Sequence, residues 1–205
     1  MSDDFSLIAQ ELIKAGRFID SRGWVPATSG NFSARLADGT IAITVSGRHK
    51  GRLTPADIMR VDFEGRSLDG QRPSAETLLH TALYRRFPQA GAVLHPHSPG
   101  SIVLSRLATG GQVRLENYEL LKALSGIETH EQVVILPIFP NDQDIARLSR
   151  RVDQWIDEHG DTRAYIIDGH GFYTWGDTVM DALRHVEALE FLFDIESRLY
   201  GARSP

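Results

Sequence analysis

Apolar positions recur along the chain with two spacings, and segments of the two kinds alternate. A spacing of three to four residues predicts amphipathic helices, whereas short runs of β-branched and aromatic residues predict strands. The predicted helices are residues 6–20, 74–87, 98–107, 141–158 and 178–199, with a looser helical segment at 115–124. The predicted strands are residues 32–36, 41–44, 59–63, 91–95, 133–136, 164–167 and 171–175.

The order of these elements indicates an α/β protein. Helices alternate with strands, and Asp38-Gly39 between two strands is a hairpin signal, so both parallel and antiparallel strand pairs are expected. The chain has no linker, low-complexity tract or internal repeat. We therefore predict a single domain over residues 1–205, folded as a three-layer α/β/α sandwich with a mixed, mainly antiparallel central sheet.

Three boundaries carry local signals. Pro96 and Pro137 lack an amide hydrogen and are expected to end the strands that precede them. Asn141 or Asp142 is expected to cap the helix that follows.

Composition narrows the range of functions. The chain of 205 residues is 41% hydrophobic and 24% charged, as in ordinary globular proteins. The net charge of −5 and the lack of a basic run argue against nucleic acid as a partner. No apolar run approaches a membrane span and the N-terminus is not signal-like, so we expect a cytoplasmic protein with no membrane partner. Without cysteine, any metal must be held by His, Asp or Glu.

Three histidines are candidate metal ligands. His95 and His97 end a predicted strand with i, i+2 spacing, which places two imidazoles on one face, although two surface histidines in a turn fit equally. His170 lies between Gly169 and Gly171, where small neighbours leave room for a metal, although alone it also fits an ordinary turn. Three imidazoles would leave the open coordination position of a catalytic zinc site.

Two glutamates are candidate acids or bases. Glu76 begins a predicted helix, where a negative charge also favours the helix dipole. Glu119 lies in the looser helical segment and also fits a solvated surface charge. His80 follows Glu76 by four residues on the same helix face, so it either supports a site or packs in the core.

Two loops have the composition of anion sites. Residues 28–31 (Thr-Ser-Gly-Asn) and 46–50 (Ser-Gly-Arg-His-Lys) offer the hydroxyls, glycine amides and lysine that a phosphate needs. Their glycine spacing matches neither a Walker nor a dinucleotide fingerprint, and each loop alone also fits a turn.

Together these motifs resemble the class II aldolase/adducin family, nearly from end to end and in the family's order. The motifs are His95-x-His97, Gly169-His170-Gly171, Ser29-Gly30-Asn31, Ser46-Gly47 and Glu76 ahead of the histidine strand. Further segments are similar to dehydratase members of that family: 27–33, 46–51, 73–80, 118–124, 137–145 and 173–176. One departure is Pro96, where relatives often have threonine.

The resemblance implies a set of roles. It implies one Zn²⁺ per subunit, held by His95, His97 and His170. It implies a phosphorylated ketose substrate bound by Ser29, Gly30, Asn31, Ser46, Gly47 and Lys50. Glu119 matches the acid/base of the dehydratases and Glu76 matches the glutamate that family aldolases use, so the division of roles between them stays open. The family also implies a homotetramer with active sites between subunits.

Other functions remain open from the sequence. An aldolase or epimerase would use the same zinc site and Glu76. A non-catalytic, adducin-like interaction domain would lose the metal histidines, which this chain keeps at 95, 97 and 170. A plain sugar-phosphate binding module would need no three-histidine site.

Overall fold

The computed structural model describes residues 4–203, in which helices and strands alternate as the hydrophobic pattern predicts. The α-helices are α1 (Asp4–Ser21), α2 (Thr77–Arg86), α3 (Pro99–Leu107), α4 (Ile145–His159) and α5 (Val179–Arg203), and the short 3₁₀ helices are η1 (Lys50–Arg52), η2 (Pro55–Asp57) and η3 (Glu119–Ala123). The strands are β1 (Asn31–Arg35), β2 (Ile41–Thr44), β3 (Ile58–Val61), β4 (Ala92–His95), β5 (Gln112–Leu115), β6 (Val134–Phe139), β7 (Ala164–Ile167) and β8 (Gly171–Gly176).

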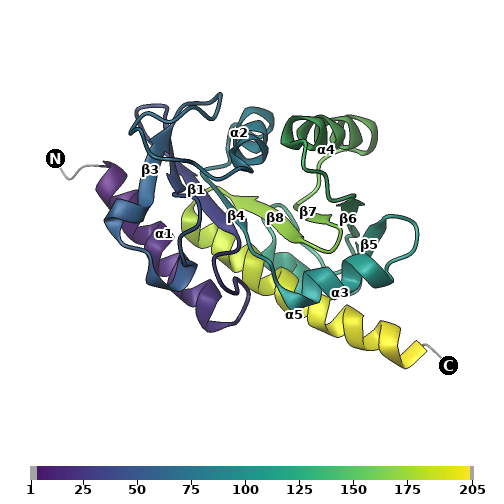
Figure 1. Cartoon of the computed structure of the whole chain (residues 1–205). Coiled ribbons are helices and arrows are strands. Elements are labelled where there is room, and N and C mark those ends of the chain that lie inside the picture. The colour runs from purple at the N-terminus through teal and green to yellow at the C-terminus, as the bar shows by residue number, and fades with distance from the viewer. Residues whose placement is uncertain (1–3, 204–205) are drawn as a thin grey trace.

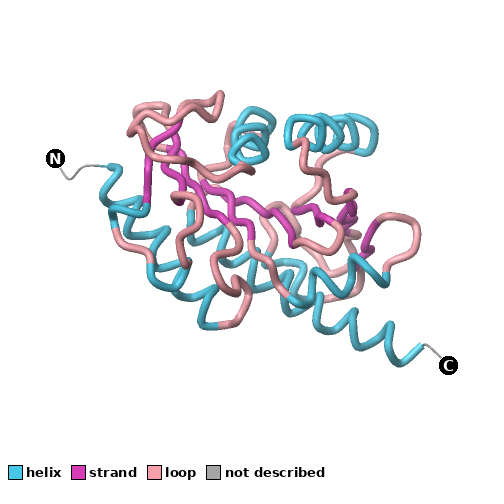
Figure 2. The backbone as a smooth tube through the Cα atoms, in the orientation of Figure 1, coloured by secondary structure: helices cyan, strands magenta, loops and turns pink. Residues whose placement is uncertain are grey.

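The strands form one sheet between two layers of helices (Figure 1). The strand order is β3-β2-β1-β4-β8-β7-β6-β5, and every neighbouring pair is antiparallel except β6 and β7. Helices α2 and α4 cover one face, and α1, α3 and α5 cover the other, as the backbone tube also shows (Figure 2). The predicted three-layer sandwich with a mixed, mainly antiparallel sheet is confirmed. None of the described helices combines the length and apolar character needed to cross a bilayer.

Alternation along the strands divides the core into two halves. In β4, Val93 packs into the cluster under α2 and α4, whereas Leu94 packs into the cluster under α1 and α5. In β8, Tyr173 and Phe172 alternate in the same way. Because side chains alternate between faces, His95 lies on the face covered by α2 and α4. The functional side chains described below gather on that face.

The segment around residue 115 differs from the prediction. The structure has the edge strand β5 at Gln112–Leu115 and only the 3₁₀ helix η3 where a helix over 115–124 was expected. The strand alternates exposed and buried positions, a pattern too short to stand out beside Gly110 and Gly111. Asn117 then turns the chain with a positive φ of 61°, which stops any regular helix from starting at residue 115.

Two boundaries after β5 were also predicted wrongly. Strand β6 does not end before Pro137 but runs through it to Phe139. The Ile138 amide donates to the Gly111 carbonyl on the β5 side, so the missing amide hydrogen of Pro137 faces β7. Pro137 tolerates this position because pairing with β7 begins only at Ile138. Helix α4 begins at Ile145, and its cap is Asp144, whose side chain accepts a hydrogen bond from the Arg147 amide, rather than Asn141 or Asp142.

The division of the core predicts a clear contrast on α1. Leu12 is fully buried against the sheet, whereas Leu7 on the same helix is 54% exposed. We expect Leu12→Ala to lower the free energy of unfolding by about 2–5 kcal/mol, because it leaves a cavity. Leu7→Ala is expected to change it by less than about 0.5 kcal/mol. Urea denaturation of both variants checks this, and equal losses would contradict the packing described.

Candidate functional site

The pairing of β1 with β4 brings two predicted site segments together. Asn31 is the register partner of His95 across this antiparallel pair. Gly30, just before β1, has a φ of +73°, and a Cβ placed on it would lie 2.6 Å from the His95 carbonyl oxygen. Only glycine allows both the conformation and the close approach. The Ser-Gly-Asn motif therefore lies directly beside the first candidate ligand.

His97 and His170 reach the same place from two loops. The hydrogen-bonded strand ends at His95, as Pro96 predicted, and the His97 amide then donates to the Trp24 carbonyl. His170 lies in the tight turn between β7 and β8, where its amide donates to the Ile167 carbonyl. These backbone bonds fix both loops, so the two imidazoles converge from different directions.

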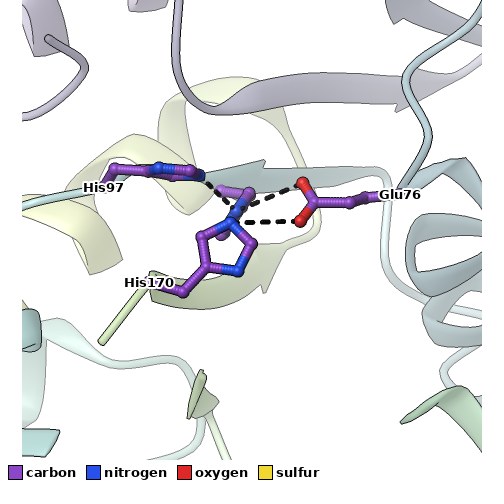
Figure 3. Close-up of side chains that lie close together, drawn as sticks. Glu76, His97 and His170 are labelled. Carbon is purple, nitrogen blue, oxygen red and sulfur yellow. Dashed lines mark hydrogen bonds and ion pairs between the residues drawn. The ribbon is translucent and has the colours of Figure 1, made fainter. Parts of the chain in front are cut away.

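Glu76 completes the cluster. It is the residue before the first turn of α2, but its side chain makes no helix-capping hydrogen bond. The carboxylate instead points toward His97 and His170, which come from other directions (Figure 3). Its side chain is only 13% exposed. The capping interpretation of Glu76 is therefore not supported by its geometry.

The four side chains present their ligand atoms to one point. One ligand atom from each of Glu76, His95, His97 and His170 can be chosen so that all four lie within 4.8 Å of one another. His95 Nε2 lies 2.8 Å from His97 Nε2 and 3.4 Å from Glu76 Oε2, and His170 Nε2 lies 3.1 Å from Glu76 Oε1. Ligand atoms around a tetrahedral zinc are roughly 3.3 Å apart, given bonds of about 2.0–2.1 Å.

The protonation states suit a divalent cation. Burial lowers the pKa of His95 well below its usual value, and the neighbouring His170 adds to the shift. Burial, together with His95 and His170, lowers the pKa of His97 to about 2. His95 also donates its Nδ1–H to the Phe172 carbonyl, 2.7 Å away, which leaves the Nε2 lone pair facing the cluster. Neutral imidazoles and one carboxylate are the ligands that divalent first-row metals accept, so these residues fit such a metal.

A cavity of about 510 Å³ opens beside the cluster. Both predicted anion loops line it, together with Glu76, His97 and His170. Lys50 is 1% exposed, and its Nζ donates to the carbonyls of Thr28 (3.0 Å) and Arg48 (2.6 Å). The remaining lining comes from Thr44, Val45, Ser74, Ala75, the loop at 141–143 and the start of α4.

The six predicted substrate residues all line this cavity, whereas Glu119 does not. Glu119 begins η3, and its side chain is 73% exposed. It forms an ion pair with Lys122 and lies 3.7 Å from His130. The hydrogen bond from Lys122 lowers the pKa of the Glu119 carboxyl. Within one chain, the structure thus brings Glu76 to the histidines and leaves Glu119 on the surface.

Comparison with known proteins identifies the family of the chain. Residues 10–197 match the Class II Aldolase and Adducin N-terminal domain family, which is most of the chain. The chain belongs to the class II aldolase and adducin family. The family resemblance predicted from the motifs is confirmed.

Individual relatives add detail. The chain is 67% identical to a methylthioribulose-1-phosphate dehydratase from Methylococcus capsulatus, an alignment that covers 98% of both proteins. It is 55% identical to the protein of the same name from Pseudomonas syringae pv. syringae, over 94% of this chain and 95% of the relative. The crystal structure of L-fuculose-1-phosphate aldolase from Thermus thermophilus superposes with a TM-score of 0.77 at 25% identity, over 98% of this chain and 100% of that one.

Sequence reasoning missed a buried polar chain behind Glu76. Asn31 Nδ2 donates to Glu76 Oε2 at 2.6 Å, and Asn31 Oδ1 contacts His80, whose other ring nitrogen contacts Ser33. Ser33 also bonds the Tyr84 hydroxyl. Two sequence signals could have revealed it: Asn31 and Ser33 alternate along one strand, and His80 and Tyr84 are four residues apart on one helix.

The closeness of the two histidine loops predicts sensitivity at Gly171. A Cβ at this position would lie 2.3 Å from the Pro96 carbonyl oxygen and 3.2 Å from His95 Cε1. We expect Gly171→Ala to push the two loops apart and to weaken binding of Zn²⁺ or Co²⁺ by at least about 10-fold. Gly201→Ala is the control, because a Cβ there meets nothing within 4 Å. Calorimetric titration of both variants measures this, and unchanged affinity in Gly171→Ala would contradict it.

Proposed function

We propose that this protein is a methylthioribulose-1-phosphate dehydratase, a hydro-lyase that converts 5-methylthioribulose 1-phosphate to 5-methylthio-2,3-dioxopentyl phosphate and water. One observation carries the proposal: dehydratases of this name share 67% and 55% of their aligned residues with nearly the whole chain. The cavity is consistent with it, because a phosphate-type donor set lies beside a histidine and carboxylate cluster. The reaction belongs to the salvage of methionine, and a cytoplasmic location remains a prediction from the sequence.

The order of strands supports one orientation for the substrate. The anion loops border β1 and β2. His97 follows β4, His170 precedes β8, and the loop at 141–143 follows β6. Along the sheet, the cavity therefore runs from hydroxyls and Lys50, past the cluster, to the first residues of α4. A substrate with phosphate on C1, a carbonyl at C2 and a methylthio group on C5 has its groups in the same order. The apolar side chains of Ile145 and Leu148 line the end left for the methylthio group.

Ser29 supports the phosphate end. Its Oγ is buried, lines the cavity and has no hydrogen-bond partner among the described residues. A buried hydroxyl without a partner is costly, and a bound phosphate oxygen would relieve that cost. Lys50 would add a charge-assisted hydrogen bond.

His95, His97 and His170 would hold one Zn²⁺, with Glu76 beside them. Bound there, the metal supplies positive charge to the substrate's C2 oxygen as negative charge develops on it. The C3 proton passes to a protein carboxylate, the C4 hydroxyl leaves as water, and the resulting enol tautomerises to the 2,3-diketone. The residues therefore need to supply one base, one acid and a fixed substrate position.

Glu119 is proposed as that acid/base, supplied by a neighbouring subunit of a homotetramer. Its exposure and its distance from the cavity lining within one chain are consistent with a role across an interface. The lowered pKa of its carboxyl keeps it ionised at neutral pH, the state required for taking the C3 proton first.

A second candidate is a sugar-phosphate aldolase or epimerase that uses Glu76. The observation in its favour is that Glu76, and not Glu119, faces the histidines within the chain. Incubation with 5-methylthioribulose 1-phosphate and with fuculose 1-phosphate separates the two candidates. Loss of one water from the first substrate supports the dehydratase, whereas carbon–carbon cleavage of the second, with no dehydration of the first, would overturn it.

The role of Glu119 predicts complementation between inactive variants. We expect Glu119→Gln to abolish dehydration while the metal stays bound. We expect His97→Ala to lose both the dehydration activity and the metal. If each active site lies between two subunits, subunits exchanged between the two variants form some sites that have both an intact Glu119 and an intact His97. Random assembly gives such a site about one time in four, so the mixture regains up to about a quarter of the sites. Glu116→Gln is the control, since Glu116 is another exposed, ion-paired glutamate of the same segment. Near-normal turnover by Glu119→Gln would refute this role.

Lys50 predicts how anion binding depends on pH. Burial lowers the pKa of Lys50 to about 8, and the Glu76 charge only partly offsets it. The phosphate dianion favours the protonated amine, so we expect the affinity for the dianion to be steady below pH 8 and to fall as pH rises through that value. Lys50→Met should weaken phosphate binding by roughly 10- to 100-fold, the range of a charge-assisted hydrogen bond, and remove the pH dependence. Lys14→Met, an exposed lysine on α1, is the control. Calorimetry with inorganic phosphate checks both, and an unchanged pH profile would count against Lys50.

A further inference from the structure

We propose that His80 is a positioning residue of the metal cluster, which acts on Glu76 through the Asn31 side-chain amide. His80 is fully buried in α2 and is not one of the four clustered residues. Its two ring nitrogens instead contact Asn31 and Ser33, both of which lie on β1. The inference rests on the proposed metal site but not on the identity of the substrate.

The direction of every hydrogen bond in this series of polar side chains follows from its first bond, between Asn31 and Glu76. The Asn31 group that faces Glu76 Oε2 at 2.6 Å is the NH₂, which donates to the carboxylate oxygen. The Asn31 carbonyl oxygen therefore faces His80 and requires a donor. His80 Nε2 must then carry the hydrogen.

The rest of the chain agrees with this tautomer. Burial lowers the pKa of His80 to about 3, so the ring is neutral and carries a single N–H. With the hydrogen on Nε2, His80 Nδ1 accepts from the Ser33 hydroxyl, 2.7 Å away. Ser33 then accepts from the Tyr84 hydroxyl at 2.8 Å. The Val93 amide N–H faces the Tyr84 oxygen, which favours the Tyr84 hydroxyl as the donor to Ser33.

The donor and acceptor roles of these polar side chains are fixed by their surroundings. Ser33, His80 and Tyr84 are each at most 1% exposed, so water does not offer these three side chains an alternative partner, and Asn31 is 4% exposed. A reversed Asn31 amide would set its oxygen against the Glu76 carboxylate and its NH₂ against the His80 N–H. Both contacts would be repulsive. His80 thus adds a second constraint to the one Glu76 places on the Asn31 amide, and that amide holds the Glu76 carboxylate toward the three ligand histidines.

The same arrangement limits what Asn31 can offer a ligand. Its carbonyl oxygen is occupied by His80 and one N–H by Glu76. Only the second N–H of the NH₂ group remains, which suits an anion and not a cation. The proposed phosphate role of Asn31 is compatible with this constraint.

The first test needs neither metal nor substrate. Long-range ¹H–¹⁵N NMR of the metal-free protein reports which ring nitrogen of His80 carries the hydrogen, and His80→Gln identifies the signal. We expect a neutral ring protonated at Nε2 from about pH 5 to about pH 8. A ring protonated at Nδ1, or a ring that titrates within that range, would overturn the proposal whatever the protein's reaction.

The second test measures the effect on the metal. His80→Gln keeps an N–H donor near the Nε2 position, whereas His80→Leu has none. We expect His80→Leu to weaken Co²⁺ binding by up to about 10-fold, the lower end of the effect of losing a direct partner of a metal ligand because His80 acts through Asn31, and to alter the Co²⁺ absorption spectrum. We expect His80→Gln to keep most of the affinity.

A matched control separates positioning from simple loss of stability. His185 is also buried and bonded at both ring nitrogens, to the Trp175 carbonyl and to Ser125, but it lies on α5 away from the cluster. His185→Leu should destabilise the fold and leave Co²⁺ affinity and spectrum unchanged. Equal changes in Co²⁺ affinity and spectrum in His80→Leu and His185→Leu would show that His80 acts only through the stability of the fold. If His80→Leu fails to fold, Tyr84→Phe removes the donor to Ser33 and should shift the His80 signals without changing the metal ligands.

Discussion

The site depends on the antiparallel pairing of β1 with β4. This pairing sets Asn31 opposite His95, and Gly30 allows the two backbones to approach closely. It also places Asn31 and Ser33 on the sheet face that α2 covers. The positions of His95, the loop at 28–31 and the polar side chains behind Glu76 therefore all depend on this one strand pairing. A shift of this register by one residue would turn each of these side chains to the opposite face.

Much of this arrangement could be predicted from sequence because it is local. Strand alternation, the proline after His95 and the two glycines around His170 each act over a few residues, and the family resemblance connected them. The boundaries that failed depend on partners distant in sequence. Pro137 is tolerated inside β6 because its missing amide hydrogen faces β7 before pairing with that strand begins, and β5 exists as a strand only because β6 lies beside it. The residues around these boundaries do not indicate which strands lie beside them.

The position of Glu119 was beyond sequence reasoning for a different reason. Spacing can place a side chain on a helix face or strand face, but it cannot say which surface meets another subunit. In the described part of the chain Glu119 is exposed and paired with Lys122, whereas Glu76 is shielded and held by Asn31. The two glutamates thus differ in freedom. Glu76 is held in place by Asn31 beside the histidines, whereas the exposed Glu119 would, under the proposed function, exchange Lys122 for a substrate.

The polar chain behind Glu76 explains how a carboxylate that is only 13% exposed can remain closely oriented without an ion pair to a lysine or arginine of the described residues. Neutral groups transmit the constraint: an amide, an imidazole, and two hydroxyls, each satisfied by the next. A fully satisfied neutral network avoids the desolvation cost of an ion pair, while each bond still restricts the rotation of its neighbour. A lysine or arginine at the position of His80 would hold Glu76 more strongly but would oppose a metal cation in the same cluster. A neutral histidine with one fixed N–H orients the carboxylate and leaves its charge available to the metal.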